Sequence, residues 1–172
     1  WDREFTKNKK SFNFVNQGFN LRPLDISAAI ALNQLKRINR FKKIRKDNRN
    51  KIINKIKSSA NWNNQFTFFE PSKNLDPSWF GLPFLINKKF LSKKKVFLQY
   101  LKKNKVETRP IISGNFTNQI SVKLHKIKFN LNKLKNAEEI EQRGFFIGLP
   151  TKLINDKTIK RLSSLLLHIS DI

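Results

Sequence analysis

The chain has 172 residues and a formal net charge of +24, from 36 lysines and arginines against 12 aspartates and glutamates. It contains no cysteine, which excludes disulfides and thiolate metal sites. No uninterrupted run of about 18 apolar residues is present, so no membrane-spanning helix is predicted. The length suits one domain. Because the chain contains no Met and starts at Trp1, we expect a piece of a longer protein, and a cytoplasmic location is compatible with the lack of cysteine.

The most informative stretch is residues 18–36, GFNLRPLDISAAIALNQLK. It reads as a tight turn, a short extended connector and the start of a long helix, because Pro23 biases Arg22 toward an extended conformation. Asp25 is predicted to cap the helix, since its carboxylate can accept first-turn N–H groups. Apolar residues then recur at spacings of three and four, which predicts one buried face of a helix over about residues 25–57. They are Ile26, Ile30, Leu32, Leu35, Ile38, Phe41 and Ile44.

The outer positions of this predicted helix carry a run of cations. They are Lys36, Arg37, Arg40, Lys42, Lys43, Arg45, Lys46, Arg49 and Lys51. Such a run is typical of a solvated face. The alternative is an electrostatic surface for an anionic partner, for which the diphosphate of a nucleotide would suffice.

Two strands are predicted in the middle of the chain. Phe66–Glu70 is expected at a sheet edge, and Trp79–Ile86 (WFGLPFLI) reads as a buried strand. Because Gly81 and Pro83 fall inside the second one, we expect it to carry a bulge or to lie at an edge. Trp79 either packs in the core or borders a ligand site. A helix over 89–104 should follow, with an apolar face formed by Phe90, Leu91, Phe97, Leu98 and Leu101.

The C-terminal part continues the alternation of strands and helices. A strand over 106–112 is predicted to lead into a turn at 113–115, which would place the Arg109 guanidinium where it can fork onto a phosphate or a carboxylate. His125 lies in a basic stretch and has either a structural or a functional role. The next elements are predicted as a helix over 135–142, a buried strand over 145–149 and a helix over 155–169, capped by Asn155 or Asp156.

These elements predict an α/β (α+β) fold in which helices cover a small, mainly antiparallel sheet. The chain has only two histidines and lacks the HExxH, GxSxG and Walker motifs. No metal site is therefore predicted, and no residue of this chain is assigned a catalytic role.

Four segments, in order, resemble the DegT/StrS family of nucleotide-sugar aminotransferases and dehydratases. Residues 18–36 are similar to the family's GYNxRPxEIxAAIGLxQLKKL, and SWFGLPFLI is similar to SWFGFPI in its 3-dehydratase branch. ETRPIISGNFTNQ resembles GIETRPIVAGNFTRNP, and FFIG matches GFFIG. The chain departs from the pattern at Asn118, where the family usually has Arg, and at Ile120, where it has Pro. Any phosphate contact of that Arg is lost or moved.

The resemblance implies a fold-type I homodimer that uses pyridoxal 5'-phosphate (PLP). Residues 18–172 would form the C-terminal small domain, preceded in 1–17 by the tail of the large domain and a lead-in strand at 11–15. Asn20 would hydrogen-bond the cofactor phosphate of the partner subunit, and Arg22 is assigned to cofactor binding with it. The resemblance places four further residues on the substrate side. They are Trp79, Arg109, Asn115 and His125.

In this family the residue beneath the cofactor is a Schiff-base Lys in aminotransferases and a His in 3-dehydratases, and it would precede Trp1. The chain alone is therefore expected to be inactive. Its parent would be a sugar-nucleotide aminotransferase or a 4-keto-6-deoxyhexose 3-dehydratase of deoxysugar and surface-polysaccharide synthesis. The expected partners are the large domain, a second subunit and a nucleotide-sugar substrate, without a membrane.

Two alternatives remain. The net charge alone would suit a nucleic-acid-binding module, because Lys and Arg neutralise phosphates and release counterions. Against this, the lysines are spread along the chain and interleaved with asparagines, and Lys greatly outnumbers Arg. The other alternative is a structural remnant that keeps the fold without the catalysis.

Overall fold

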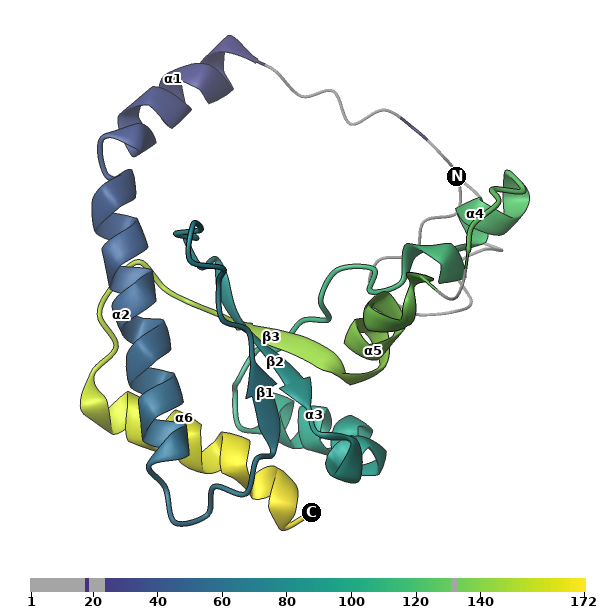
Figure 1. The fold of residues 1–172 in the computed structure, drawn as a ribbon. Coiled ribbons are helices and arrows are strands. Elements are labelled where there is room, and N and C mark those ends of the chain that lie inside the picture. The colour runs from purple at the N-terminus through teal and green to yellow at the C-terminus, as the bar shows by residue number, and fades with distance from the viewer. Residues whose placement is uncertain (1–17, 19–23, 131–132) are drawn as a thin grey trace.

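The computed structural model describes residue 18, residues 24–130 and residues 133–172. The predictions for Asn20, for Arg22 and for the lead-in strand at 11–15 therefore lie outside the described residues. Figure 1 shows the arrangement of the elements. In chain order these are α1 (Asp25–Leu35), α2 (Ile38–Lys57), β1 (Phe66–Phe68), β2 (Gly81–Ile86), η2 (Lys88–Lys93), α3 (Lys94–Lys103), η3 (Phe116–Asn118), α4 (Ile120–Leu124), α5 (Lys135–Arg143), β3 (Gly144–Gly148), α6 (Asp156–Leu167) and η5 (His168–Ser170).

Within the described residues, the three strands form an antiparallel sheet in the order β1-β2-β3. The register pairs Phe68 with Phe84, and Phe84 in turn with Phe145. Side chains alternate along β2, so that Leu82, Phe84 and Ile86 are buried while their neighbours are half-buried. The sheet thus has one fully buried face, and β1 lies at its edge as the sequence predicts.

Pro83 lies inside the central strand β2, whose register with both neighbours has no bulge, so the predicted bulge or edge position was wrong. Phe146 of β3 lies opposite Pro83. The N–H and C=O of Phe146 point away from β2 and bond to the backbone of Arg109, at N···O distances of 2.8 and 2.9 Å. Pro83 and Phe146 are therefore a non-hydrogen-bonded pair. On the other side, β1 pairs with β2 only as far as Phe84. The missing N–H of proline consequently removes no ladder hydrogen bond.

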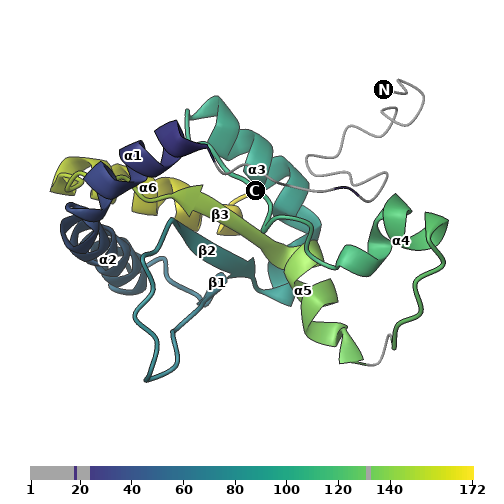
Figure 2. The ribbon, with the colours of Figure 1, turned by 90° about the horizontal axis from the view of Figure 1, so that it is seen from above.

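Aromatic rings fill the space between the buried face of the sheet and the helices. The rings of Phe84 and Phe145 are stacked with their centroids 4.9 Å apart, and Phe66 meets Phe84 edge-on at 5.2 Å. Helices α2, α3 and α6 lie around the sheet (Figure 2). Their buried apolar side chains complete this core. These are Ile52, Ile53, Ile56, Phe97, Leu101, Ile159, Leu166 and Leu167.

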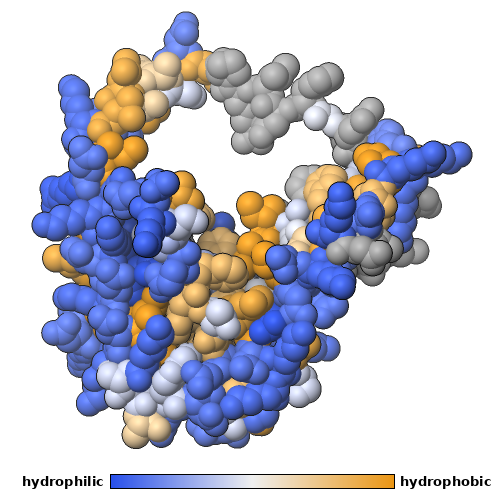
Figure 3. Space-filling model, viewed as in Figure 1, coloured by the Kyte–Doolittle hydropathy of each residue, from blue (hydrophilic) through white to orange (hydrophobic). Residues whose placement is uncertain are grey.

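The single helix predicted over 25–57 is two helices. Arg37 N–H bonds to the carbonyl of Gln34, three residues back, and a turn at Lys36 and Arg37 separates α1 from α2. Only α2 packs against the core, through its C-terminal half. The apolar residues of α1 are 57–69% exposed instead of forming the predicted buried face (Figure 3). They are Ile26, Ile30, Leu32 and Leu35.

The two predicted helix caps have different outcomes. Asp25 is the first residue of α1, which has Leu24 as its N-cap and no capping bond from a side chain, so that prediction was wrong. Its carboxylate still complements the partial positive charge of the first turn. Asn155 caps α6 as predicted, because its side chain accepts a hydrogen bond of 2.8 Å from the Thr158 N–H.

The remaining predictions differ in their boundaries or their type. The helix expected over 89–104 is a 3-10 segment, η2, continued by α3. The strand expected over 106–112 is reduced to one bridge between Arg109 and Phe146, because the chain turns away at Ile112, whose φ is +41°. Helix α5 and strand β3 form as predicted. In the part of the chain that is described, no helix has both the length and the apolar character that crossing a bilayer requires.

Candidate functional site

A groove of about 340 Å³ lies where the C-terminal end of β3 passes α2. Its lining combines two arginines, one glutamate and two aromatic rings, contributed by α2, β3 and the segments before β2 and beside β3. The lining residues are Arg45, Phe80, Glu107, Arg109, Phe146, Gly148, Leu149 and Pro150. This combination of cations with one exposed and one half-buried ring makes the groove our candidate functional site.

Helix α2 places Arg45 on one wall of the groove. Its Nε donates to the Leu149 carbonyl at 3.2 Å, and its guanidinium carbon lies 6.0 Å from the centroid of the Phe80 ring. Phe80 is 67% exposed, although it neighbours the buried strand β2. A phenyl ring held open to solvent beside a guanidinium provides a surface on which a planar ligand can stack.

The opposite wall carries Arg109. Its backbone is fixed by the two hydrogen bonds to Phe146. Its Nε and Nη2 both donate to one carboxylate oxygen of Glu107, at 2.9 and 2.8 Å. In this structure the partner of the Arg109 guanidinium is thus the chain's own carboxylate, and a forked contact with a ligand remains a prediction. Among the described residues, the other N–H groups of Arg109 and the Nη groups of Arg45 donate no hydrogen bond, which leaves donors for an anionic ligand.

The groove depends on the close approach of two strands at Gly81. A Cβ added there would lie 2.5 Å from the Phe146 ring and 2.8 Å from the Ile147 carbonyl oxygen. Only glycine leaves room for the Phe146 ring in this position. By contrast, a Cβ added at Gly148, in the groove itself, would meet no atom within 4 Å. The packing of β2 against β3 therefore requires glycine at position 81, within the WFGLP segment.

Trp79 is adjacent to Phe80 in sequence but is not part of the groove lining. Its ring lies against Arg49, with 4.3 Å between the guanidinium carbon and the ring centroid. Arg49 also donates to the Phe69 carbonyl at 2.6 Å and pairs with Glu70 at 3.0 Å. The expectation that Arg49 belongs to a solvated face was wrong, because its side chain is only 6% exposed. Trp79 thus joins α2 to the loop before β2.

Asn115 is buried and bonded to α5. Its amide nitrogen donates to Glu138 at 3.0 Å, and its carbonyl oxygen accepts from the N–H and hydroxyl of Thr117. Asn118 donates to Glu138 and to Glu141, at 3.2 and 2.8 Å. Hydrogen bonds from Asn115, Gln142 and Asn118, in that order of effect, lower the pKa of Glu138. The turn before η3 is thereby tied to α5, and a substrate contact of Asn115 remains a prediction.

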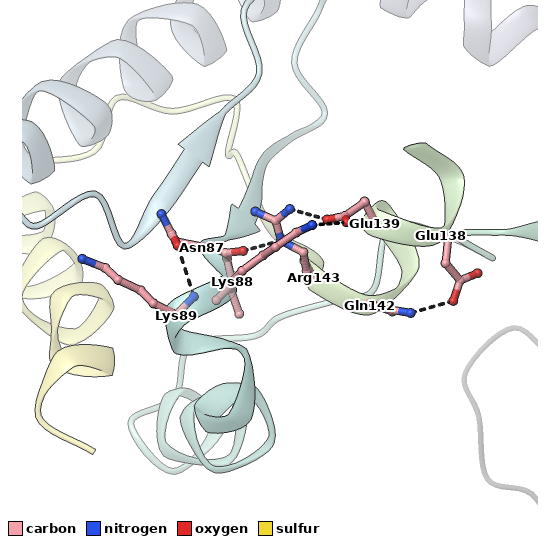
Figure 4. A network of polar contacts seen from close by, with 8 residues as sticks. Asn87, Lys88, Lys89, Glu138, Glu139, Gln142 and Arg143 are labelled. Carbon is pink, nitrogen blue, oxygen red and sulfur yellow. Dashed lines mark hydrogen bonds and ion pairs between the residues drawn. The ribbon is translucent and has the colours of Figure 1, made fainter. Parts of the chain in front are cut away.

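The other end of α5 is anchored by a second set of ion pairs, shown in Figure 4. Lys88 and Arg143 flank the Glu139 carboxylate, with Lys88 Nζ at 2.7 Å, and these contacts hold the pKa of Glu139 below its ordinary value. Arg143 also donates to the Ile86 carbonyl at 2.7 Å. Lys94 donates to the Gln142 carbonyl at 2.6 Å, and burial lowers its pKa. Helix α5 is thus fixed to the end of β2 and to α3.

The structure separates the site residues that the sequence singled out. His125 follows α4 as an exposed C-cap residue, away from the lining of the groove. Of the four predicted substrate-side residues that the structure describes, the groove includes Arg109 alone. The sequence analysis included Arg45 only in the run of cations that could form a surface for an anionic partner, and it did not single out Phe80 or Glu107 as site residues. No local pattern indicates that these three residues meet, because their meeting depends on the pairing of β2 with β3 and on the packing of α2 beside β3.

A protein-family model described as the DegT/DnrJ/EryC1/StrS aminotransferase family matches residues 2–165. The GDP-4-keto-6-deoxy-D-mannose 3-dehydratase of Escherichia coli O55:H7 is 33% identical over 140 residues, which are 81% of this chain and 34% of that protein. The protein of the same name from Yersinia pseudotuberculosis is 29% identical over 141 residues, with the same coverage. The chain spans about a third of the length of these curated relatives.

Among solved structures, this chain is also similar to 3-dehydratases. A variant of GDP-4-keto-6-deoxymannose-3-dehydratase with bound GDP-perosamine has a TM-score of 0.72 and 30% identity, covering 93% of this chain and 40% of that one. The E. coli enzyme with bound hydrated PLP has a TM-score of 0.70 at the same identity, covering 96% of this chain and 40% of that one. Helicobacter pylori PseC, an aminotransferase at 21% identity, shares the fold with a TM-score of 0.69, covering 90% and 39%. The predicted fold class is confirmed, and the chain belongs to the DegT/DnrJ/EryC1/StrS aminotransferase family.

Proposed function

We propose that this chain is the small domain of a PLP-dependent 4-keto-6-deoxyhexose 3-dehydratase that acts on a sugar nucleotide. The observation that carries the proposal is the 33% identity over 140 residues with the E. coli 3-dehydratase. The aminotransferase PseC matches at only 21%. A further relative, at 27% identity, is the lipopolysaccharide biosynthesis protein RfbH of Salmonella typhimurium, which supports a role in surface-polysaccharide synthesis.

In this proposal the groove binds the nucleotide part of the substrate. Its two guanidinium groups suit the diphosphate, because Arg forms forked hydrogen bonds with phosphate oxygens. Glu107 holds the Arg109 guanidinium in one orientation before the ligand arrives. The exposed Phe80 ring offers a stacking surface to the base. Contacts of Trp79, Asn115 and His125 with the sugar or with the partner subunit remain predictions.

The donor set proposed for the cofactor fits a phosphate group. An Asn amide and an Arg guanidinium, as at Asn20 and Arg22, both donate hydrogen bonds to phosphate oxygens. We propose that this turn reaches the cofactor of a second subunit in a homodimer. The PLP group, when bound, supplies the electron sink for the reaction, and the protein supplies binding and orientation. This chain expressed alone is therefore expected to show no turnover.

The test is an assay of the complete gene product with GDP-4-keto-6-deoxy-D-mannose, PLP and glutamate, followed by mass spectrometry of the sugar product. The proposal predicts a product that has lost the C3 oxygen and gained no nitrogen. An amino sugar as the product would contradict the dehydratase assignment. Absence of any reaction from a protein that binds PLP would contradict the proposed substrate class.

A further inference from the structure

A second hollow, larger than the groove, lies between the C-terminal half of α2 and the first turns of α6. Its volume is about 750 Å³, within the range of small-molecule sites. Four lysines dominate its lining, together with one carboxylate and two neutral polar side chains. The lining residues are Lys51, Asn54, Lys55, Ser58, Asp156, Lys157, Ile159 and Lys160.

Helix α2 packs against α6 (Figure 1), and the hollow lies between the two helices. Ile52 and Ile56 of α2 and Ile159 of α6 are buried in the core, which fixes the two helices side by side. Positions 51, 55 and 58 are spaced by four and three residues, so they share the next face of α2. Lys157 and Lys160 are three residues apart and therefore lie on one face of α6. The four amines are thus brought to one hollow by both helices.

The positive charge of this hollow is poorly compensated. Asp156 is the single acidic residue of the lining, and its side chain is 96% exposed. It pairs with Lys51, whose Nζ lies 3.9 Å from Oδ1 and therefore beyond hydrogen-bond distance. Elsewhere in the described chain, carboxylates are bracketed more tightly: Glu139 pairs with Lys88 and Arg143, and Asp76 pairs with Lys42 at 2.6 Å and Lys46 at 3.6 Å.

A net charge of about +3 therefore remains in the α2/α6 hollow, from four lysines and one aspartate. Like charges held together repel each other, and a bound anion removes this repulsion. Lysine binds phosphate as a compact point charge, so several amines around one hollow suit a ligand with several phosphate oxygens. The neutral side chains of Asn54 and Ser58 add hydrogen-bonding groups on the same wall.

We propose that the α2/α6 hollow binds a small oligophosphate, such as pyrophosphate or the diphosphate of a free nucleotide. The site is separate from the groove, because residues 51–58 lie one and a half to four turns beyond Arg45 on α2, roughly 10–20 Å at 1.5 Å per residue. A small ligand fits better than a nucleic acid, because the amines surround one hollow instead of following a track with the spacing of backbone phosphates. This inference does not depend on the proposed function.

The test is a calorimetric titration of the complete gene product with inorganic pyrophosphate, which lacks the base and sugar of the proposed substrate, at 0.15 M salt. We expect saturable binding of one oligophosphate that weakens at least tenfold in the double variant Lys55→Gln/Lys160→Gln. The matched control is Lys102→Gln/Lys105→Gln, which removes the same charge from another hollow beside α3 and should change the affinity less than twofold. Thermal unfolding checks that both variants fold, which is expected because all four lysines are exposed.

Three results would overturn the proposal. Equal losses in the two double variants would show that only the overall charge matters. Loss of binding in Arg109→Gln but not in Lys55→Gln/Lys160→Gln would place the phosphate in the groove. Tighter binding of a DNA duplex than of pyrophosphate, weakened equally by both double variants, would indicate a nucleic-acid surface.

Discussion

At the scale of single residues, three arginines of the described chain have two different roles. Arg49 is buried by α2 and holds the loop before β2 through Trp79, Phe69 and Glu70. Arg45 and Arg109 face the groove and keep N–H groups that the described protein atoms do not use. The first kind supports the fold, and the second is available to a ligand.

We expect Arg49→Met to lower the free energy of unfolding by about 2 kcal/mol. It removes a charge-assisted hydrogen bond to the Phe69 carbonyl, worth about 1.5–3 kcal/mol, and a contact with the Trp79 ring worth about 1 kcal/mol. The same substitution removes the Arg49 Nε, which is buried without a hydrogen-bond partner, and this gain offsets part of the loss. The control is Lys43→Met on the exposed side of the same helix, which should change stability by less than about 0.5 kcal/mol. Equal effects in a urea titration would contradict this role of Arg49.

Arg109→Gln tests the proposed substrate role. In the complete enzyme, loss of a forked guanidinium from the substrate phosphate should raise KM at least tenfold, about 1.4 kcal/mol, with a smaller change in kcat. Arg40→Gln removes the same charge from an exposed position of α2 and should leave both constants unchanged. Steady-state kinetics of the two variants is the measurement. A normal KM in Arg109→Gln would place the nucleotide elsewhere.

At the scale of elements, β2 and β3 meet at a glycine that cannot be enlarged. In Gly81→Ala the new methyl group would clash with the Phe146 ring and the Ile147 carbonyl, and we expect a loss of about 2 kcal/mol from this overpacking. Gly148→Ala lies on the paired strand in open space and is the matched control. Thermal unfolding of both variants measures the difference. Equal melting temperatures would contradict the tight packing described here.

Helix α5 gives the fold a dependence on pH. Ion pairs with Lys88 and Arg143 lower the folded-state pKa of Glu139 below its ordinary value of 4.5. A carboxyl group with a lowered folded-state pKa stabilises the protein above the unfolded-state value, and this contribution is lost as the pH falls below 4.5. The wild type should therefore melt at a higher temperature than Glu139→Gln at pH 7, and the difference should shrink below pH 4.5. A difference that stays constant down to pH 3 would contradict this contribution.

At the scale of the whole molecule, sequence periodicity predicted the elements whose buried residues follow a regular spacing. The alternation in GLPFLI located β2, and the stripe at Ile159, Leu166 and Ile169 located α6. The same rule failed for α1, whose apolar residues point in all directions around the helix and are exposed in the described structure. Periodicity predicts that a face is apolar, but what covers that face depends on tertiary contacts.

The candidate site was predicted only in part, for a related reason. Arg109 could be identified because a motif carries it, and the structure places it in the groove. Arg45 and Phe80 are 35 residues apart and meet there because of the packing of α2 beside β3, which no local pattern encodes. Asn115 lies on a motif as well, yet its side chain is committed to Glu138 and Thr117. A motif therefore identifies a residue without showing which way its side chain is directed.

We propose above that this chain is part of a PLP-dependent 3-dehydratase of sugar nucleotides. Reading the coding sequence upstream of the Trp1 codon tests this, because it identifies the residue at the position beneath the cofactor. We expect a cofactor-binding domain with His at that position. A Lys there would make the parent an aminotransferase, and a reading frame without a cofactor-binding domain would contradict the proposed function.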